Sequence, residues 1–213
     1  MVQTKSEGRR YSGLDPDERD RKRREAVLGA ALELFGTQGY AATSVKRVCR
    51  EAGLTERYFY ACFRDRHDCL AGLYAELTDS MRAAVLAALD KTAGSDLDTR
   101  AHTGLDAFIG FLTADPRRAR VVLIEVVGVS DELEARRNGV LREFADLITA
   151  VWSLPEEPAT RAAVDLHRLT AVGLVGAVNH LLVDWLQRGQ EDDPATLVDV
   201  CSALFSAARE RVG

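Results

Sequence analysis

The sequence lacks any long uninterrupted apolar segment. Its longest hydrophobic runs are broken by Glu125, Asn179, His180 and Asp184, whereas a membrane-spanning helix needs roughly 18 or more consecutive apolar residues. The N-terminal stretch MVQTKSEGRRYSG also lacks the apolar core of a signal peptide. We therefore expect a protein that does not enter a membrane and that stays in the cytoplasm.

Metal-binding and catalytic motifs are missing as well. The four cysteines form no C-x-x-C pair, and the four histidines form no H-x-x-x-H or H-E-x-x-H pair. No G-x-S-x-G sequence or phosphate-binding loop is present. We expect no metal, no cofactor and reduced, mostly buried thiols. An all-α enzyme is the weakest of the functions that we consider.

The alternation of apolar and polar residues that marks strands is absent too, and every periodic segment is helical. With 213 residues, of which 46% are hydrophobic, the chain is long enough to bury a core. We predict an all-α fold of about nine helices. Their expected ranges are 16–35, 44–52, 55–63, 66–91, 99–114, 116–129, 131–152, 159–189 and 194–211.

Charge is distributed unevenly along the chain. Residues 1–66 hold 14 Lys and Arg against 10 Asp and Glu, a balance of +4, whereas residues 67–213 hold 14 against 23, a balance of −9. A basic N-terminal part and an acidic remainder indicate two different tasks, and the basic part is the candidate for binding nucleic acid.

The segment from Thr43 to Leu70 carries the strongest local signals. Thr43 or Ser44 can cap a short helix, Gly53 can end it in a left-handed turn, and Thr55 can cap a second short helix. Asp65 can then cap a third. Two short helices joined by a tight turn are typical of a helix-turn-helix that reads DNA.

The second short helix of this segment has an unusual outer face. Phe59 and Phe63 are spaced to face inward, which leaves five side chains toward solvent or a ligand: Glu56, Arg57, Tyr58, Tyr60 and Ala61. An ordinary helical hairpin is the alternative interpretation. The short helices, the A-G-L turn, the caps and this polar and aromatic face occur together, which favours DNA binding.

Three stretches resemble the TetR-like (tetracycline-repressor) family of bacterial transcriptional regulators. They are AALELFGTQGYAATSV at 30–45, REAGL at 50–54 and YFYACF-x-D-R-x-x-x-L at 58–70. Residues 1–14 are polar and show no periodicity, so we expect a flexible tail there. The resemblance implies a DNA-binding domain at 15–65 and a ligand-binding and dimerisation domain at 66–213. It also implies a homodimer that represses transcription until a small molecule releases it from a double-stranded DNA operator. An activator, or a regulator that senses a partner protein, fits the same residues.

The resemblance also implies roles for individual residues in DNA binding. Thr43 and Lys46 would contact the DNA backbone, Tyr60 and Arg66 would hold phosphates, and Thr55, Glu56, Arg57 and Tyr58 would face base edges. Arg57 and Tyr58 are larger than the residues usual in the family, and an arginine there could pair with guanine for about 1–3 kcal/mol of discrimination. Ala61 and Cys62 replace residues that commonly contact the backbone.

Two apolar stripes near the C-terminus are candidates for a dimer interface. The first is formed by Leu166, Leu169, Gly173, Gly176 and His180, and the second by Leu197, Cys201, Leu204, Phe205 and Ala208. Helical periodicity alone fits a monomer core equally well. The family resemblance favours a four-helix dimer interface.

A ligand pocket is expected among the helices between residues 66 and 189, lined by apolar side chains with a few polar groups. The candidate lining residues are Phe108, Phe111, Trp152 and Trp185, with His102, His167 or Asn179 as polar groups. Aromatic residues at helical spacing are also common in ordinary cores, so that alternative stays open.

Overall fold

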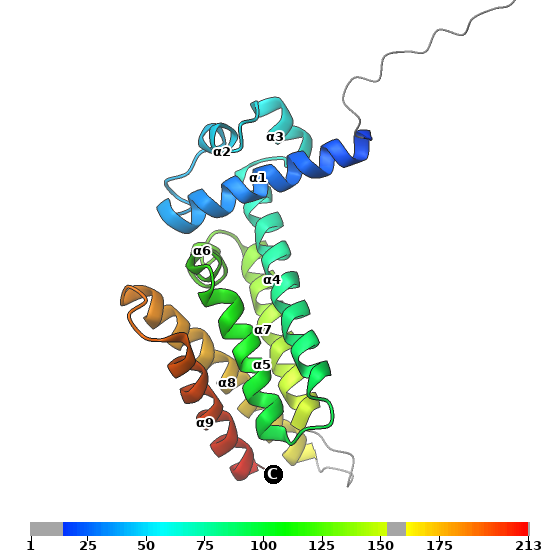
Figure 1. Ribbon diagram of the computed structural model, residues 1–213, viewed down its shortest axis with the longest axis vertical. Helices are drawn as coiled ribbons and strands as arrows, with labels where there is room; N and C mark the ends of the chain where they lie inside the picture. Colours follow the sequence, from blue (N-terminus) through cyan, green and yellow to red (C-terminus); the bar gives the residue numbers. More distant parts are fainter. Residues whose placement is uncertain (1–14, 153–160, 213) are drawn as a thin grey trace, which may run out of the picture.

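The computed structural model describes residues 15–152 and 161–212, and this part of the chain is helical without a strand (Figure 1). The predicted all-α fold of about nine helices is confirmed. The helices are α1 (Pro16–Gln38), α2 (Val45–Glu51), α3 (Glu56–Cys62), α4 (Arg66–Lys91), α5 (Leu97–Thr113), α6 (Pro116–Arg120), the π-helical turn η1 (Val121–Glu125), α7 (Asp131–Trp152), α8 (Arg161–Gln187) and α9 (Pro194–Val212). The tail predicted at 1–14 lies outside the described residues.

Helices α1, α2 and α3 form a head at one end of the molecule, and α4 to α9 form a body (Figure 1). Helix α4 begins at the head and runs along the body beside α5. Helix α6 and η1 pack against α1. The head is therefore joined to the body in two places, through α4 and through the contact of α1 with α6 and η1.

Side-chain caps fix where several helices begin. Ser44 Oγ accepts a hydrogen bond from the Arg47 backbone N–H, and Asp65 Oδ1 accepts one from the Asp68 N–H at 2.8 Å. Both caps were predicted, although Thr43 was an equal candidate for the first. Thr55 precedes α3 without a side-chain cap bond. Gly53 has φ of +66°, the left-handed conformation expected at the turn between α2 and α3.

Two helices differ most from their predicted ranges. Helix α1 continues through Gly36 to Gln38 and is followed by Gly39, whose φ of +88° suits glycine. The single helix expected at 116–129 is α6 followed by η1. A π-helical turn carries one extra residue, which hydrophobic periodicity does not reveal, and such turns often occur at functional sites.

The core runs without interruption from the head into the body. In the head it is built on Phe35, Val48 and Phe59, and in the body the same cluster continues through Ile109 and Leu182, all of them essentially inaccessible to solvent. The four cysteines are free, and only Cys62 is not fully buried. Burial raises the pKa of the Cys69 thiol to about 12, which keeps it protonated and unreactive.

The residues predicted for the dimer interface divide into a buried group and an exposed group. Leu197, Cys201 and Phe205 of α9 are buried against the rest of the same chain, so the prediction that they form a dimer interface is wrong and they belong to the monomer core. The other five predicted interface residues are exposed, namely Leu169, Gly173, Gly176 and His180 of α8 and Leu204 of α9.

Helix α8 is unusually apolar for its degree of burial. By length and composition alone, its segment Ala163–Gln187 could cross a membrane, and it is the single helix in the described part of the chain for which that holds. Only 28% of its most apolar window is buried. The helix therefore presents a large apolar surface outward.

Candidate functional site

The outer face of α3 is the first candidate site. Glu56, Arg57 and Tyr60 are exposed, and Tyr60 keeps 54% of its surface accessible while its ring meets the buried Phe59 edge-on. Tyr58 is half-buried because the Arg23 guanidinium of α1 lies 4.2 Å from its ring centre. Thr55 at the start of α3 and Lys46 on α2 are exposed as well.

Thr43 does not lie where the resemblance placed it. Its side chain is 1% exposed, and its hydroxyl donates a hydrogen bond to the Gly39 carbonyl at 2.8 Å. A buried hydroxyl with an internal partner cannot reach a DNA phosphate, so the predicted backbone contact of this side chain is wrong. Thr43 instead fixes the connection between α1 and α2.

Arg66 is also occupied within the protein. Its Nη1 donates to the carbonyls of Thr43 at 2.5 Å and Tyr40 at 3.1 Å, and its guanidinium lies 4.2 Å from the centre of the Tyr40 ring. The half-buried side chain thus ties the start of α4 to the connection between α1 and α2. These bonds make Arg66 a positioning residue for the head rather than a free phosphate ligand.

A buried carboxylate joins the body to the head. Glu125, at the end of η1, accepts a hydrogen bond from the Tyr40 backbone N–H at 2.7 Å and another from Arg120 Nε at 2.8 Å. Its side chain is only 12% exposed. Charge-assisted hydrogen bonds of this kind are stronger than neutral ones, so the position of Tyr40 is coupled to that of η1.

A second polar contact joins α6 to α1. Arg117 of α6 donates to Glu33 of α1 and, through Nη2, to Asp115 at 2.7 Å. The hydrogen bond from Arg117 holds the pKa of the Asp115 carboxyl below its ordinary value, and the two acidic partners raise the pKa of Arg117. Asp115 also caps α6 through the Arg117 backbone N–H.

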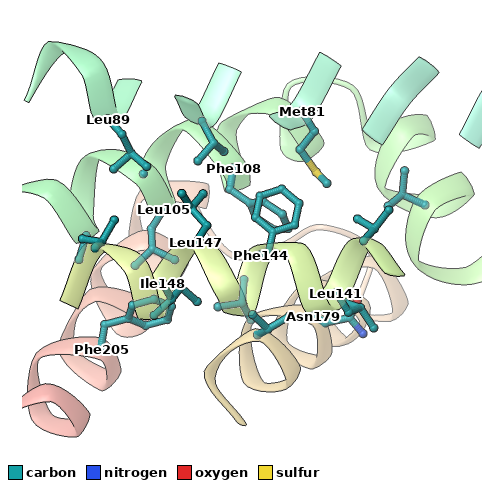
Figure 2. Close-up of a pocket in the computed structure, with 18 of the residues that line it drawn as sticks. Met81, Leu89, Leu105, Phe108, Leu141, Phe144, Leu147, Ile148, Asn179 and Phe205 are labelled. Atoms are coloured by element: carbon teal, nitrogen blue, oxygen red, sulfur yellow. The ribbon is translucent and has the colours of Figure 1, made fainter. Parts of the chain in front are cut away.

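The second candidate site is a cavity of about 110 Å³ inside the body. Figure 2 shows side chains from α4, α5, α7, α8 and α9 converging on one space, among them Met81, Phe108, Phe144 and Asn179. Phe108 and Phe144 meet edge-on with ring centres 5.1 Å apart. Val122 and Leu123 of η1 also line the cavity. The walls are almost entirely hydrocarbon, so the cavity suits an apolar ligand.

The predicted ligand residues divide into two groups. Phe108, Trp152 and Asn179 line the cavity, whereas Phe111 and Trp185 do not. The Phe111 ring lies 4.7 Å from the Arg118 guanidinium, and Trp185 Nε1 donates to the Asp192 carbonyl at 3.0 Å. Both aromatic residues therefore have other packing roles, and their prediction as cavity-lining residues is wrong.

The two histidines considered as polar groups also lie elsewhere. His102 Nδ1 is 3.1 Å from Ser202 Oγ, and His167 Nε2 is 2.9 Å from the Val212 carbonyl. Both contacts hold α9 to a neighbouring helix. Asn179 is the one member of the three that reaches the cavity.

Comparison with known protein families shows which family the head resembles. Residues 27–73 match the family described as "Bacterial regulatory proteins, tetR family". The match begins inside α1, includes α2 and α3 and ends in α4, so it covers the whole outer face of α3. The chain is a TetR-like transcriptional regulator.

The similarity of this TetR-like regulator to known proteins extends over most of its length. It is 24% identical to the HTH-type transcriptional regulator AcrR of Shigella flexneri over 174 residues, and this alignment covers 80% of this chain and 81% of that one. The fatty acid degradation regulator FadR from Bacillus halodurans has a similar structure, with a TM-score of 0.71, 18% identity and coverage of 91% of this chain and 96% of that chain.

A third similar structure contains a ligand. FadR from Bacillus subtilis in complex with stearoyl-CoA has a TM-score of 0.64 and 17% identity, and the likeness covers 85% of this chain and 96% of that chain. At these identities the structures establish the fold that the TetR-like regulator shares with them, and the family match establishes DNA binding.

Sequence reasoning missed two charged residues of the cavity. Arg100 of α5 and Arg137 of α7 line it in this TetR-like regulator. Of the 28 basic residues in the chain 24 are arginines, so no single arginine stands out in the sequence. Only the packing of α5 against α4 and α7 shows that these two face inward.

Proposed function

We propose that the chain is a homodimeric repressor that binds a specific DNA operator and is released when a small apolar molecule enters the body cavity. The observation that carries this proposal is the position of Glu125. This residue holds the Tyr40 N–H of the head and ends the same π-helical turn whose Val122 and Leu123 line the cavity. A ligand that moves η1 would therefore move the head.

We propose a division of the chain into two domains. Residues 15–65 serve as the DNA-binding domain and residues 66–213 as the ligand-binding and dimerisation domain. Helix α4 belongs to the body but starts in contact with the head through Arg66. The regulator acts in the cytoplasm, where its operator DNA is accessible.

In the DNA complex, the exposed face of α3 would enter the major groove. Arg57 and Glu56 are free to reach base edges there, while Tyr60, Thr55 and Lys46 are exposed beside them. We expect Arg57→Ala to relax sequence preference by about 1–3 kcal/mol at one base pair. Lys46→Ala should instead weaken binding to all DNA sequences about equally and reduce the salt dependence of binding. Equal effects of both changes on preference would contradict these roles.

The dimer would use the exposed apolar strip of α8 and α9. The strip contains Leu166, Leu169, Val172, Gly173, Gly176, His180, Val200 and Leu204. The leucine, glycine and histidine positions of α8 repeat every three or four residues, which aligns them on one face of the helix. Two copies joined there would present two α3 helices to one operator, and half-sites lie about 34–36 Å apart in such complexes.

A charge in this strip tests the dimer. Leu169 is 57% exposed in the single chain, so Leu169→Glu should leave the protomer folded but place two carboxylates in the shared interface. We expect a monomer by light scattering and loss of tight operator binding. Val127→Glu is the matched control because Val127 is 50% exposed but lies outside α8 and α9. A dimer that survives Leu169→Glu would place the interface elsewhere.

Release by ligand is a linkage between two sites. In the DNA-bound form, Glu125 holds Tyr40. If the ligand favours a position of η1 in which this contact is lost, ligand binding lowers the affinity for the operator. By linkage, DNA binding then lowers the affinity for the ligand by the same factor. Glu125→Ala should speed hydrogen exchange at the Tyr40 amide and change operator affinity. Glu143→Ala removes a surface partner of Arg82 on the body and should do neither.

A gel shift with DNA flanking the regulator's own gene tests the DNA half of the proposal. A salt-sensitive and sequence-preferring complex at micromolar dimer is expected, and its absence would refute sequence-specific binding. An activator, or a regulator that senses a partner protein, is the second candidate. Deleting the gene raises reporter expression if the protein represses and lowers it if the protein activates. We propose no catalytic role.

A further inference from the structure

One end of the cavity holds an arginine whose charge is not balanced. Arg100 lines the cavity together with Leu89 of α4, Trp152 of α7 and Phe205 of α9. Its Nε atom is buried without a hydrogen-bond partner. Within residues 15–152 and 161–212, no ion pair of its guanidinium is found. A buried N–H group without a partner is costly, and more so when it carries charge.

The second arginine of the cavity has a different environment. Arg137, near the start of α7, has a carboxylate at 3.9 Å in Glu134 on its own helix. It is also close enough to the buried Tyr74 to act on that hydroxyl, although burial dominates and raises the Tyr74 pKa to about 12. Of the two cationic side chains, Arg100 is thus the one that lacks a negative partner.

The dimensions of the cavity limit what can occupy it. The volume of the cavity is about 110 Å³. The lining extends along α7 from Arg137 to Trp152, fifteen residues or about 22 Å of helix. A small volume bordered by so long a wall suits a thin, unbranched chain better than a fused ring system.

We infer that the cavity binds an unbranched aliphatic carboxylate, with its carboxylate on Arg100 and its chain directed toward Met81 and Asn179. An arginine and a carboxylate can form two parallel charge-assisted hydrogen bonds, which would satisfy the buried Nε. The hydrocarbon walls would enclose the chain. This inference rests on the proposed role of the cavity as the effector site, and it names the class of effector.

The acyl-CoA bound by FadR from Bacillus subtilis is a thioester, and its acyl group carries no negative charge. Such a group cannot form the paired hydrogen bonds with Arg100 that a free carboxylate forms. We therefore expect a free acid to bind more tightly than a neutral chain of the same length.

Calorimetry with two compounds of the same chain length tests the inference: decanoate and decan-1-ol. Wild-type protein should bind decanoate about tenfold or more tightly than decan-1-ol, because only the acid pairs with Arg100. Arg100→Met keeps an unbranched apolar stem and removes the charge, so it should abolish this preference and leave decan-1-ol binding unchanged. Arg137→Met is the matched control, which should keep the preference.

Several outcomes would overturn the inference. They are equal binding of decanoate and decan-1-ol by the wild type, an unchanged preference in Arg100→Met, loss of preference in Arg137→Met instead, and no binding of either compound. Thermal unfolding of each variant shows whether it is folded.

A gel shift with the same samples separates this inference from the proposed function. If decanoate binds in an Arg100-dependent manner but leaves operator affinity unchanged, the assignment of the cavity stands and ligand release fails. If no operator complex forms at all, the proposed function fails while calorimetry still decides the role of Arg100.

Discussion

The head and the body of this regulator place their functional residues by different means. In the head, α3 is seven residues long and only its inner face, through Phe59, is buried. Its other side chains are exposed or only partly buried. In the body, the cavity forms where six elements meet, and no single helix defines it. A local sequence pattern can therefore specify the first site but not the second.

The same contrast applies to stability. The head is a small unit whose core depends on a few large side chains, with Phe35, Phe59 and Val48 fully buried at its centre. The body already contains unfilled space beside Phe108 and Phe144. A side chain in a cavity wall has fewer packing contacts than one in a filled core. Truncating a side chain should therefore lower the free energy of unfolding more in the head than in the body.

Phe59→Ala and Phe108→Ala test this difference directly and should give the largest effect. We expect Phe59→Ala to lower the free energy of unfolding by about 3–5 kcal/mol, enough to unfold the head. Phe108→Ala should cost less than half as much and should enlarge the cavity. Urea unfolding measures both changes. Equal losses would show that the cavity wall is packed as tightly as the head.

The junction between head and body should be the next most sensitive region. Gly36 of α1 faces α6 so closely that a Cβ would lie 2.4 Å from Arg117 Cβ and 2.8 Å from Arg117 Cα. Because a backbone atom is involved, the two helices must move apart. We expect Gly36→Ala to cost about 1–3 kcal/mol of stability and to shift operator affinity by disturbing the coupling through Glu125.

Gly29 provides the matched control on the same helix. A Cβ there would meet nothing within 4 Å, so Gly29→Ala should stabilise the protein by about 0.5–1 kcal/mol through helix propensity alone. Operator affinity should not change. If Gly36→Ala were also stabilising, the close contact of α1 with α6 would not exist in solution.

These regions also show what the sequence could and could not predict. The caps at Ser44 and Asp65 and the turn at Gly53 were predictable because each depends on residues a few positions away. Thr43 could not be distinguished from Ser44, since both can cap a helix. Its burial results from the fold of α1 back toward α2, where the Gly39 carbonyl accepts its hydroxyl.

In the body, periodicity identified apolar faces but not the surfaces that they contact. Leu204 and Phe205 are adjacent in the sequence, yet Leu204 is exposed and Phe205 lines the cavity. Phe108 and Phe111 both look like core residues, but only Phe108 reaches the cavity. Which neighbour covers each face depends on how the helices pack, and no local pattern contains that information.

The pH dependence of the junction should give the smallest effect. Asp115 has a lowered pKa because Arg117 donates hydrogen bonds to it. Its ionised form therefore stabilises the fold above its ordinary pKa of 3.8, and that contribution disappears as the pH falls through the lower pKa of the folded state. Asp115→Asn should cost about 1 kcal/mol or less at pH 7, because Arg117 is 41% exposed and solvent screens the pair.

Asparagine caps helices about as well as aspartate, so this change isolates the charge from the cap. The difference between wild type and Asp115→Asn in urea unfolding should be constant from pH 7 to about pH 5 and should vanish once the wild-type carboxyl is protonated. Asp106→Asn, at an exposed position of α5, should show no such pH dependence. If the difference in the free energy of unfolding persisted in acid, Asp115 would stabilise the junction through its shape and hydrogen bonds and not through its charge.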